Sequence, residues 1–284
     1  MKKENINLGK ISVILADIDG TLVNKGEQIM PKTKEMITFL HEKGVLFGLA
    51  TGRKITHQMF ARKDAWKLSF DFDVMIGMNG GQLWDRFHDE YEEYCLLSTD
   101  TMKEILDMMA PLKQNAFIYE EDYMVSMYLD EMVKASMNRN KINVVVTDGD
   151  AYRLCIKPNF NILYRVPLGE EKRILAYANE HPSDKYVAVH TSPGIIEFMD
   201  PRVNKGLALK KFSERNRIPV SEIMAFGDMD NDKDLVKEAG WGVCLLNGSE
   251  LTKANADDIT DYPCTEDGMG RYLEKLWNAK AFTV

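Results

Sequence analysis

The chain has 284 residues, 45% of them hydrophobic and 28% charged, which is the composition of an ordinary soluble globular protein with one large domain or two. Its formal net charge of −8 at pH 7, with no local cluster of lysine and arginine to offset it, argues against a nucleic-acid surface. A protein of this charge that handles an anionic substrate would need a metal ion or a focused cationic site.

The first predicted element is a strand over 11–16, an apolar run rich in β-branched residues that stops at Asp17 and Asp19. Such a run is typical of a buried parallel strand, and ligands of parallel sheets bind beyond the carboxyl ends of the strands. Gly20 lets the chain leave the strand sharply, and Thr21 supplies a hydroxyl. Taken alone, the two aspartates fit a capped strand end with an acidic turn equally well.

Helices and strands alternate after this first strand. Helical patterns run from Pro31 to Gly44 and over 56–66, and apolar strands are predicted at 45–50 and 74–78. The order strand, helix, strand, helix, strand is the signature of a doubly wound parallel sheet. Such a sheet would bring the polar turns after its strands to one edge, here Thr51-Gly52-Arg53 and Asn79-Gly80-Gly81.

From Leu83 the pattern changes, and we expect an inserted α+β domain over 83–199 between the two parts of an α/β core, 1–82 and 200–284. The strand-like stretches of this insert are 91–97, 117–120, 123–127, 186–190 and 195–199. Its helices follow Thr101, Asp130 and Gly169. Thr101-Met102-Lys103-Glu104 fits a capping box, and Ser192-Pro193-Gly194 predicts a hairpin turn between the last two strands.

After Asp200 the parallel pattern resumes. A helix is predicted from Lys205 to about Asn216, followed by strands at 223–226 and 242–246 and a closing helix over 267–277. The first of these strands stops at the acidic turn Gly227-Asp228-Met229-Asp230-Asn231-Asp232.

Other features concern the environment of the protein. The four cysteines, Cys95, Cys155, Cys244 and Cys264, form no CxxC pair, so we expect core residues in a reducing compartment and no zinc ribbon. The amino-terminal residues lack the apolar region of a signal peptide, and no apolar run reaches the length of a membrane span. We therefore expect a cytoplasmic protein without membrane contact; nothing in the sequence assigns an oligomeric state.

Six polar side chains would converge at one edge of the predicted sheet: Asp17, Asp19, Thr51, Lys205, Asp228 and Asp232. Carboxylates packed that closely repel, so without a cation at least one would be protonated. Magnesium fits this inventory, because it prefers oxygen ligands and combines one or two protein carboxylates with substrate phosphate. An EF-hand calcium loop is excluded, because Lys233 and Ala239 occupy the positions where such a loop requires Gly and Glu. A solvated acidic turn that binds no ligand is the remaining alternative for these aspartates.

Other phosphate-binding and hydrolytic motifs are absent from the sequence. There is no GxGxxG fingerprint, no GxxxxGK[ST] loop and no GxSxG elbow. The five histidines show no metal-ligand spacing such as HExxH. A dinucleotide fold, a P-loop and a serine hydrolase are therefore unsupported.

Four segments resemble, in order, the four motifs of the haloacid dehalogenase-like (HAD) superfamily, and most closely its Cof-type phosphatases with a type IIB α/β cap. They are Asp17-Ile18-Asp19-Gly20-Thr21-Leu22, Ala50-Thr51-Gly52-Arg53, Lys205-Gly206 and Gly227-Asp228-Met229-Asp230-Asn231-Asp232. The resemblance spans nearly the whole chain. Its small departures are Lys54, where Pro is common, and Leu235, where Met is common.

The resemblance implies a role for each matching residue. Asp17 would be the nucleophile that forms an aspartyl-phosphate, and Asp19 the general acid and base. The metal site would consist of Asp17, the backbone carbonyl of Asp19, and Asp228, with Asp232 either in this site or orienting Lys205. The phosphoryl group would be bound by Thr51, Gly52, Lys205 and Asn231.

The implied function is a magnesium-dependent phosphatase acting on a small phosphorylated metabolite, a sugar phosphate or a phosphorylated cofactor. A phosphomutase of the same superfamily and a non-catalytic phosphate-ligand sensor are the alternatives. Specificity would reside in the inserted domain, since the core binds only the phosphoryl group. Its candidates are Tyr119, Tyr123, Tyr128, Arg153 and Lys157, although packing or solvated surface is the commoner role of such side chains.

Overall fold

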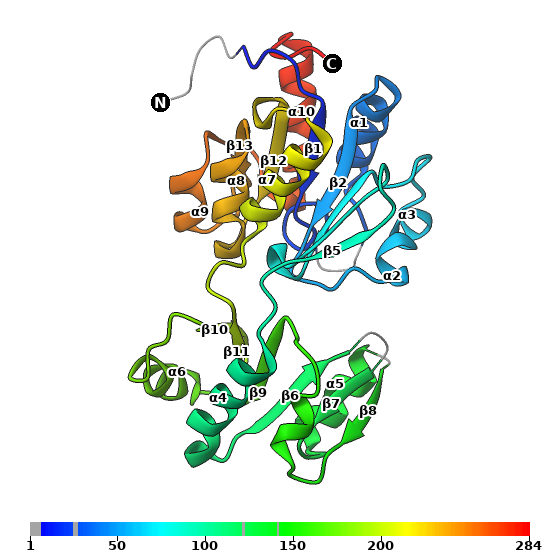
Figure 1. Cartoon of the computed structure of the whole chain (residues 1–284). Coiled ribbons are helices and arrows are strands. Elements are labelled where there is room, and N and C mark those ends of the chain that lie inside the picture. The colour runs from blue at the N-terminus through cyan, green and yellow to red at the C-terminus, as the bar shows by residue number, and fades with distance from the viewer. Residues whose placement is uncertain (1–6, 25–27, 121–122, 141) are drawn as a thin grey trace. The chain divides into compact units, whose positions relative to one another are not determined.

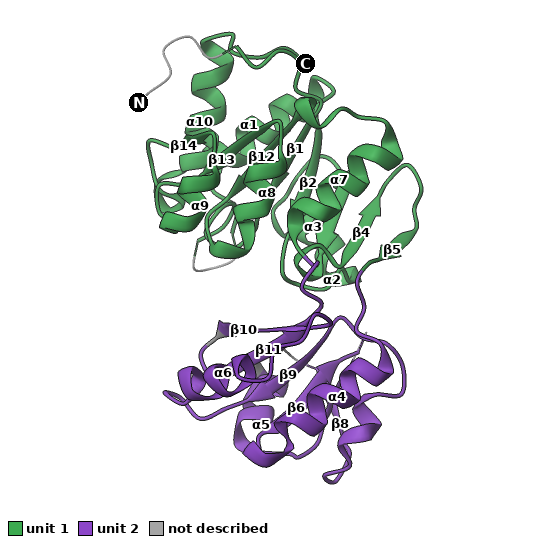
Figure 2. Ribbon diagram, turned by 60° about the vertical axis from the view of Figure 1, so that its left-hand side comes forward, with its two compact units in different colours: residues 1–94, 204–284 green, residues 95–203 purple. Residues whose placement is uncertain are grey.

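The computed structural model describes residues 7–24, 28–120, 123–140 and 142–284. The chain forms two compact units, which Figure 2 colours green and purple. The first unit combines residues 1–94 with 204–284, and the second consists of residues 95–203. Each unit has its own sheet and its own hydrophobic core.

An eight-stranded sheet forms the centre of the first unit, and its six parallel strands confirm the predicted doubly wound α/β fold. In spatial order the strands are β14 (Asp258–Ile259), β13 (Trp241–Cys244), β12 (Ile223–Gly227), β1 (Val13–Ala16), β2 (Leu46–Ala50), β3 (Val74–Gly77), β4 (Gln82–Asp85) and β5 (Tyr91–Glu93). The last two strands are antiparallel to their neighbours.

Helices cover both faces of this sheet (Figure 1). Successive residues of β1 point to opposite faces, so Ile14 packs in a core with α1 (Pro31–Glu42) and α10 (Gly268–Asn278). Leu15 packs on the other face with α7 (Lys205–Asn216) and α8 (Lys233–Glu238). A strand buried on both faces needs apolar residues at every position, which explains the unbroken run before Asp17.

The strand β1 lies at the point where the strand order reverses. The chain runs from β1 to β2 and β3 on one side, and after the second unit it continues at β12 on the other side of β1. In sheets of this type, ligands bind in the crevice beyond the carboxyl ends of the strands at the reversal. That crevice receives the residues after β1, β2 and β12.

The second unit is an α+β domain, as predicted. Its sheet has the order β10 (Val187–Ser192), β11 (Ile195–Met199), β9 (Asn161–Arg165), β6 (Asn115–Tyr119), β7 (Tyr123–Ser126) and β8 (Asn143–Val146), and only β7 and β8 are parallel. The helices α4 (Thr99–Met109) and α6 (Glu171–Asn179) pack on one face. The helix α5 (Glu131–Asn140) contributes Val133 to the core on the other face.

Both boundaries between the units differ from the predicted positions, because the first unit extends to residue 94 instead of 82 and resumes at residue 204 instead of 200. The strands β4 and β5 add two antiparallel strands to the edge of the core sheet, so the first unit extends to Tyr94. Cys95 then has a positive φ of 54°, where the chain leaves that sheet. The predicted strand over 91–97 is therefore limited to Tyr91–Glu93.

Two local predictions were wrong in detail. The single helix expected over 56–66 is two short helices, α2 (His57–Phe60) and α3 (Arg62–Ala65). They are separated at Ala61, whose ψ of −12° departs from the value of about −42° typical of an α-helix. The helix expected to begin at Thr101 is capped instead by Ser98, whose hydroxyl accepts a hydrogen bond from the Thr101 amide at 3.1 Å. One further helix of the first unit, α9 (Glu250–Asn255), lies between β13 and β14 in the chain.

The cysteines are unpaired, as expected, and three of the four are buried. Among the described residues, no helix combines the length and the apolar character that crossing a membrane requires.

Candidate active site

The turn after β1 brings its side chains to the acidic turn after β12. Gly20 has φ +94°, and a Cβ at this position would lie 2.3 Å from Asp228 Oδ2, so only glycine allows the two turns to approach this closely. The Thr21 hydroxyl donates a hydrogen bond of 3.0 Å to Asp228 Oδ1. The sequence Asp-Gly-Thr thus fixes one side of the Asp228 carboxylate.

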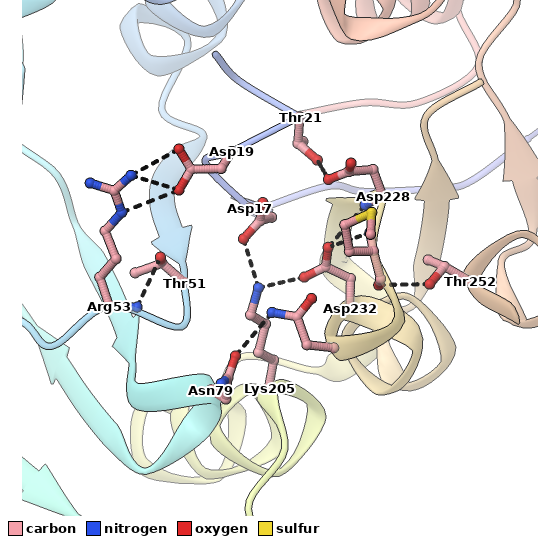
Figure 3. Close-up of polar contacts among 12 residues, drawn as sticks. Asp17, Asp19, Thr21, Thr51, Arg53, Asn79, Lys205, Asp228, Asp232 and Thr252 are labelled. Atoms are coloured by element: carbon pink, nitrogen blue, oxygen red, sulfur yellow. Dashed lines mark hydrogen bonds and ion pairs between the residues drawn. The ribbon is translucent and has the colours of Figure 1, made fainter. Parts of the chain in front are cut away.

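Lys205 is the fully buried cation of the site. It is the first residue of α7, where Asn204 caps the helix by accepting a 2.7 Å hydrogen bond from the Leu207 amide. Its Nζ donates to Asp17 Oδ1 at 2.7 Å and to Asp232 Oδ1 at 2.5 Å (Figure 3). One ammonium therefore joins the carboxylates that follow β1 and β12.

Asp232 is engaged through both of its oxygens. While Oδ1 accepts from Lys205, Oδ2 accepts from the backbone amides of Asp228 at 2.9 Å and of Met229 at 3.1 Å. Asp232 is fully buried, so these contacts close the turn around Asp228 and orient the lysine at the same time.

Three buried carboxylates form an acidic cluster. Asp17, Asp228 and Asp232 each offer one oxygen within 4.8 Å of the others, so they could hold a metal ion. Burial, reinforced by Asp232 and Asp228, raises the pKa of Asp17 to about 7 although Lys205 opposes the shift. Burial and the charge of Asp232 likewise raise the pKa of Asp228 to about 6.

The same charges act on the lysine in the opposite sense. Burial disfavours the ammonium of Lys205, but the carboxylates of Asp17 and Asp232 outweigh it and raise the pKa of Lys205 above its ordinary value. Three ionised carboxylates and one ammonium would leave two negative charges in the site. A divalent cation matches this charge, and its preferred ligands are oxygens of this kind.

Asp19 lies apart from the acidic cluster. Its side chain is more than half exposed and pairs with Arg53, whose Nη2 lies 2.9 Å from both carboxylate oxygens and whose Nε lies 3.2 Å from Oδ2 (Figure 3). The Arg53 amide also donates to the Thr51 hydroxyl at 3.2 Å. Thr51 is buried at the end of β2, whereas Gly52 is exposed. The structure thus links the turns after β1 and β2.

A third turn completes the edge of the sheet. After β3, Met78, Asn79 and Gly80 have successive positive φ values of 48°, 53° and 104°. This backbone places the Asn79 side chain against Asn231, whose Nδ2 donates to Asn79 Oδ1 at 3.0 Å. A Cβ on Gly80 would lie 2.0 Å from the carbonyl oxygen of Asn204, so this turn also supports the start of α7.

Three side chains of the site, those of Asn79, Asn247 and Arg53, have no role predicted from the sequence. Asn247, in the loop after β13, donates from Nδ2 to the Gly20 carbonyl at 3.0 Å and to Asp228 Oδ2 at 3.3 Å, while its Oδ1 accepts from the Cys264 amide at 2.7 Å. Arg53 was recognised only as part of a motif. A loop asparagine carries no pattern in one sequence, whereas Arg53 lies in the polar turn that follows the strand predicted at 45–50, and that position is a usable signal.

The fold and the acidic site at its strand-order reversal define a Rossmann-like α/β protein with a candidate metal site. The sequence model of the haloacid dehalogenase-like hydrolases matches residues 14–273, and the chain belongs to this family. The resemblance predicted from the four motifs is thereby confirmed.

Individual relatives are distant but match almost end to end. The 5-amino-6-(5-phospho-D-ribitylamino)uracil phosphatase YcsE of Bacillus subtilis is 27% identical, over 93% of this chain and 94% of its own. The solved structure of TM0651 from Thermotoga maritima has a TM-score of 0.81 at 22% identity and covers 93% of this chain and 97% of that one. A subclass IIB sugar phosphatase of the superfamily, BT4131, has a TM-score of 0.74 at 23% identity, with 93% and 98% covered.

Proposed function

We propose that this protein is a magnesium-dependent phosphatase that hydrolyses a small phosphorylated metabolite through an aspartyl-phosphate on Asp17. The observation that carries the proposal is the buried contact of 2.7 Å between Asp17 and Lys205, beside Asp228 and Asp232. A carboxylate in this position is oriented for attack, and the ammonium next to it can bind a phosphoryl oxygen. The first unit would be the catalytic core and the second the cap.

In the proposed first step, a carboxylate oxygen of Asp17 attacks phosphorus and the bond from phosphorus to the ester oxygen breaks. Asp19 gives its proton to the departing oxygen, which leaves as an alcohol. In the second step, Asp19 accepts a proton from water, and the water oxygen attacks phosphorus and releases inorganic phosphate from Asp17. Splitting one displacement into two steps is the purpose of the nucleophile.

The ion pair between Asp19 and Arg53 affects the proposed role of Asp19 as a proton donor. Both oxygens of Asp19 are engaged by the Arg53 guanidinium. Because a proton donor must face the ester oxygen, we infer that this pair opens when substrate binds. The guanidinium released in this way could bind oxyanions of the bound substrate through two parallel hydrogen bonds.

The phosphoryl group would be bound by groups from two strand ends and one helix start. Thr51 would donate its hydroxyl and Gly52 its backbone amide, while Lys205 supplies a charge at the start of α7. Asn231 would donate from the amide that now contacts Asn79. Preorganised donors of this kind supply most of the catalysis in phosphoryl transfer.

Magnesium fits the donor set of the acidic cluster. Asp17, Asp228 and the backbone carbonyl of Asp19 would hold the ion, which when bound neutralises phosphoryl charge. Asp232 differs from Asp228 in its partners, because it is fully buried and accepts from the Lys205 ammonium and from two backbone amides, whereas Asp228 accepts only from the side chains of Thr21 and Asn247 among the described residues. We therefore assign Asp232 to orienting Lys205, and Asn247 with Thr21 to orienting Asp228.

The substrate class rests on the relatives. YcsE is named for a phosphorylated ribitylaminouracil and BT4131 for sugar phosphates, and both names describe small phosphate monoesters. A sugar phosphate or a phosphorylated cofactor is accordingly proposed here. A phosphomutase would return the phosphoryl group to a product isomer, and a sensor would bind its ligand without turnover.

The test is a screen for phosphate release across a library of phosphorylated metabolites, with and without magnesium. Release from at least one sugar phosphate or phosphorylated cofactor, lost on chelation, supports the proposal. Isomerised product without free phosphate would identify a mutase. Binding without any product would identify a sensor.

A further inference from the structure

The second unit contains a cavity that the proposed chemistry does not use. It has a volume of about 300 Å³, at the lower end of the range for small-molecule sites. Strands β6, β7 and β8 and the segment 151–157 line it, so it lies entirely within one unit. Its floor consists of Ile118, Val125 and Leu154, which are buried in the core beneath α4 and α6.

Exposed apolar side chains surround the opening. Ile156 is 79% exposed, and Val145 and Tyr123 are also among the exposed large hydrophobic residues. Isolated exposed side chains of this kind are ordinary, but three that border one cavity with an apolar floor form a continuous apolar surface. An apolar molecule of matching size would bury this surface.

A hydroxyl inside the cavity lacks a partner. Thr147 lines the cavity and is 3% exposed, and its Oγ1 has no hydrogen-bond partner among the described residues. A buried hydroxyl without a partner is costly, so a ligand oxygen that accepts its hydrogen would be favoured. The Thr147 amide donates a hydrogen bond of 3.0 Å to the Ser126 carbonyl, which holds the backbone of this residue in place.

The charge around the cavity is positive. Lys157 pairs with Glu120 at 2.7 Å, whereas no ion pair joins Arg153 to another residue in the described part of the chain. Two cations and one carboxylate leave one positive charge at the cavity of a protein whose net charge is −8. The charge therefore selects an anionic ligand.

We propose that this cavity is a second binding site, which takes a small organic anion with an apolar body. The apolar body would rest on Ile118, Val125 and Leu154, and the anionic group would be met by Arg153 and the Thr147 hydroxyl. This inference goes beyond the proposed phosphatase function. The ligand would be an organic anion separate from the phosphate ester, since the cavity and the acidic cluster belong to different units.

The probe for this site is 8-anilinonaphthalene-1-sulfonate, an aromatic anion that fluoresces in apolar sites. We expect the folded protein to bind it, with affinity reduced about threefold or more in Arg153→Gln and about fivefold or more in Thr147→Val. Ile156→Glu, at an exposed position that cannot affect the core, should abolish binding by placing a carboxylate at the opening.

Lys34→Gln is the matched control. It removes a cation from the groove on α1, a cavity of about 410 Å³, and should leave the affinity unchanged. Equal affinity of the native protein, Arg153→Gln, Thr147→Val and Ile156→Glu would overturn the proposal. Because the titration needs no turnover, its result is independent of whether the protein proves to be a phosphatase.

A second measurement separates this site from the proposed phosphatase site. We expect the probe to bind without changing KM for 1-naphthyl phosphate or for glycerol 2-phosphate, and we expect Arg153→Gln to leave both KM values unchanged. Competition between the probe and 1-naphthyl phosphate would contradict a separate site.

Discussion

Lys205 Nζ lies 2.7 Å from Asp17 Oδ1, although the two residues are 188 positions apart in the chain and both are buried. The contact joins the end of β1 to the start of α7, on either side of the inserted unit. It gives the acidic cluster its countercharge. The stability of the core and the chemistry proposed for it therefore depend on the same pair.

Removal of the lysine should destabilise the protein. In Lys205→Met the buried carboxylates of Asp17 and Asp232 lose their countercharge, and we expect a loss of about 3–5 kcal/mol in the free energy of unfolding at neutral pH. Denaturant unfolding measures it. The control Lys211→Met changes a half-exposed lysine of the same helix and should cost less than about 1 kcal/mol. Equal losses in both variants would contradict the role of Lys205.

The acidic cluster should make stability depend on pH. Because the pKa of Asp17 is about 7 in the folded chain against an ordinary 3.8, the folded state binds more protons than the unfolded state between these values. The contribution of Asp17 to stability therefore falls as pH rises from about 4 to 7. Thermal unfolding of the native protein and Asp17→Asn without metal should show a smaller decline in the variant.

Bound magnesium should oppose the fall in stability with rising pH. The ion binds ionised carboxylates, so the increase in Tm on adding magnesium should grow as pH rises through the pKa values of Asp228 and Asp17, about 6 and 7. A magnesium effect that is constant across this range, or equally large in Asp17→Asn, would show that the ion binds elsewhere.

Loss of the Asn247 side chain should weaken magnesium binding more than it slows the chemical step. Its amide holds Asp228 Oδ2 at 3.3 Å, so Asn247→Ala should weaken magnesium binding about 10- to 100-fold, the usual effect of losing a partner of a metal ligand. Calorimetric titration of magnesium and the magnesium dependence of turnover should both report this change. The control Asn255→Ala removes a half-buried asparagine of α9 whose side-chain amide donates to the Leu251 carbonyl at 2.8 Å. Matching results for the two variants would refute the assignment.

Alanine substitutions at two glycines with similar φ distinguish the energetic cost of backbone strain from that of a steric clash. Gly44 has φ +99° with no atom within 4 Å of an added Cβ, while Gly80 has φ +104° with the Asn204 carbonyl oxygen at 2.0 Å. We expect Gly44→Ala to cost about 1–2 kcal/mol of stability from backbone strain alone. Gly80→Ala should cost clearly more and also lower activity, because the turn after β3 would have to move away from Lys205. Equal unfolding free energies would exclude the clash.

Much of the first unit could be predicted from the sequence because buried parallel strands have a strong signal. The apolar runs before Asp17, Thr51 and Asp228 end where the strands end, and the reversal of strand order then brings these three residues to one edge. Lys205 was predicted at a helix start, which is where it lies.

The remaining features depend on tertiary contacts that leave no local pattern. The strand β4 has only four residues, all buried, so periodicity could not place it in the core sheet. The contacts of Asn247 and the pair of Asp19 with Arg53 join loops that are distant in sequence. The partner of a surface side chain is set by the whole fold, whereas the end of a buried strand is set by its own residues.

The most direct test of the central claim is the rate of phosphate release from p-nitrophenyl phosphate, in the presence of magnesium, by the native protein and by Asp17→Asn. The substitution keeps the size of the side chain but removes the nucleophilic carboxylate, so we expect a fall of about 10³-fold or more in kcat. Circular dichroism should show an unchanged fold. Turnover by Asp17→Asn at the native rate would contradict the assignment of Asp17 as the nucleophile.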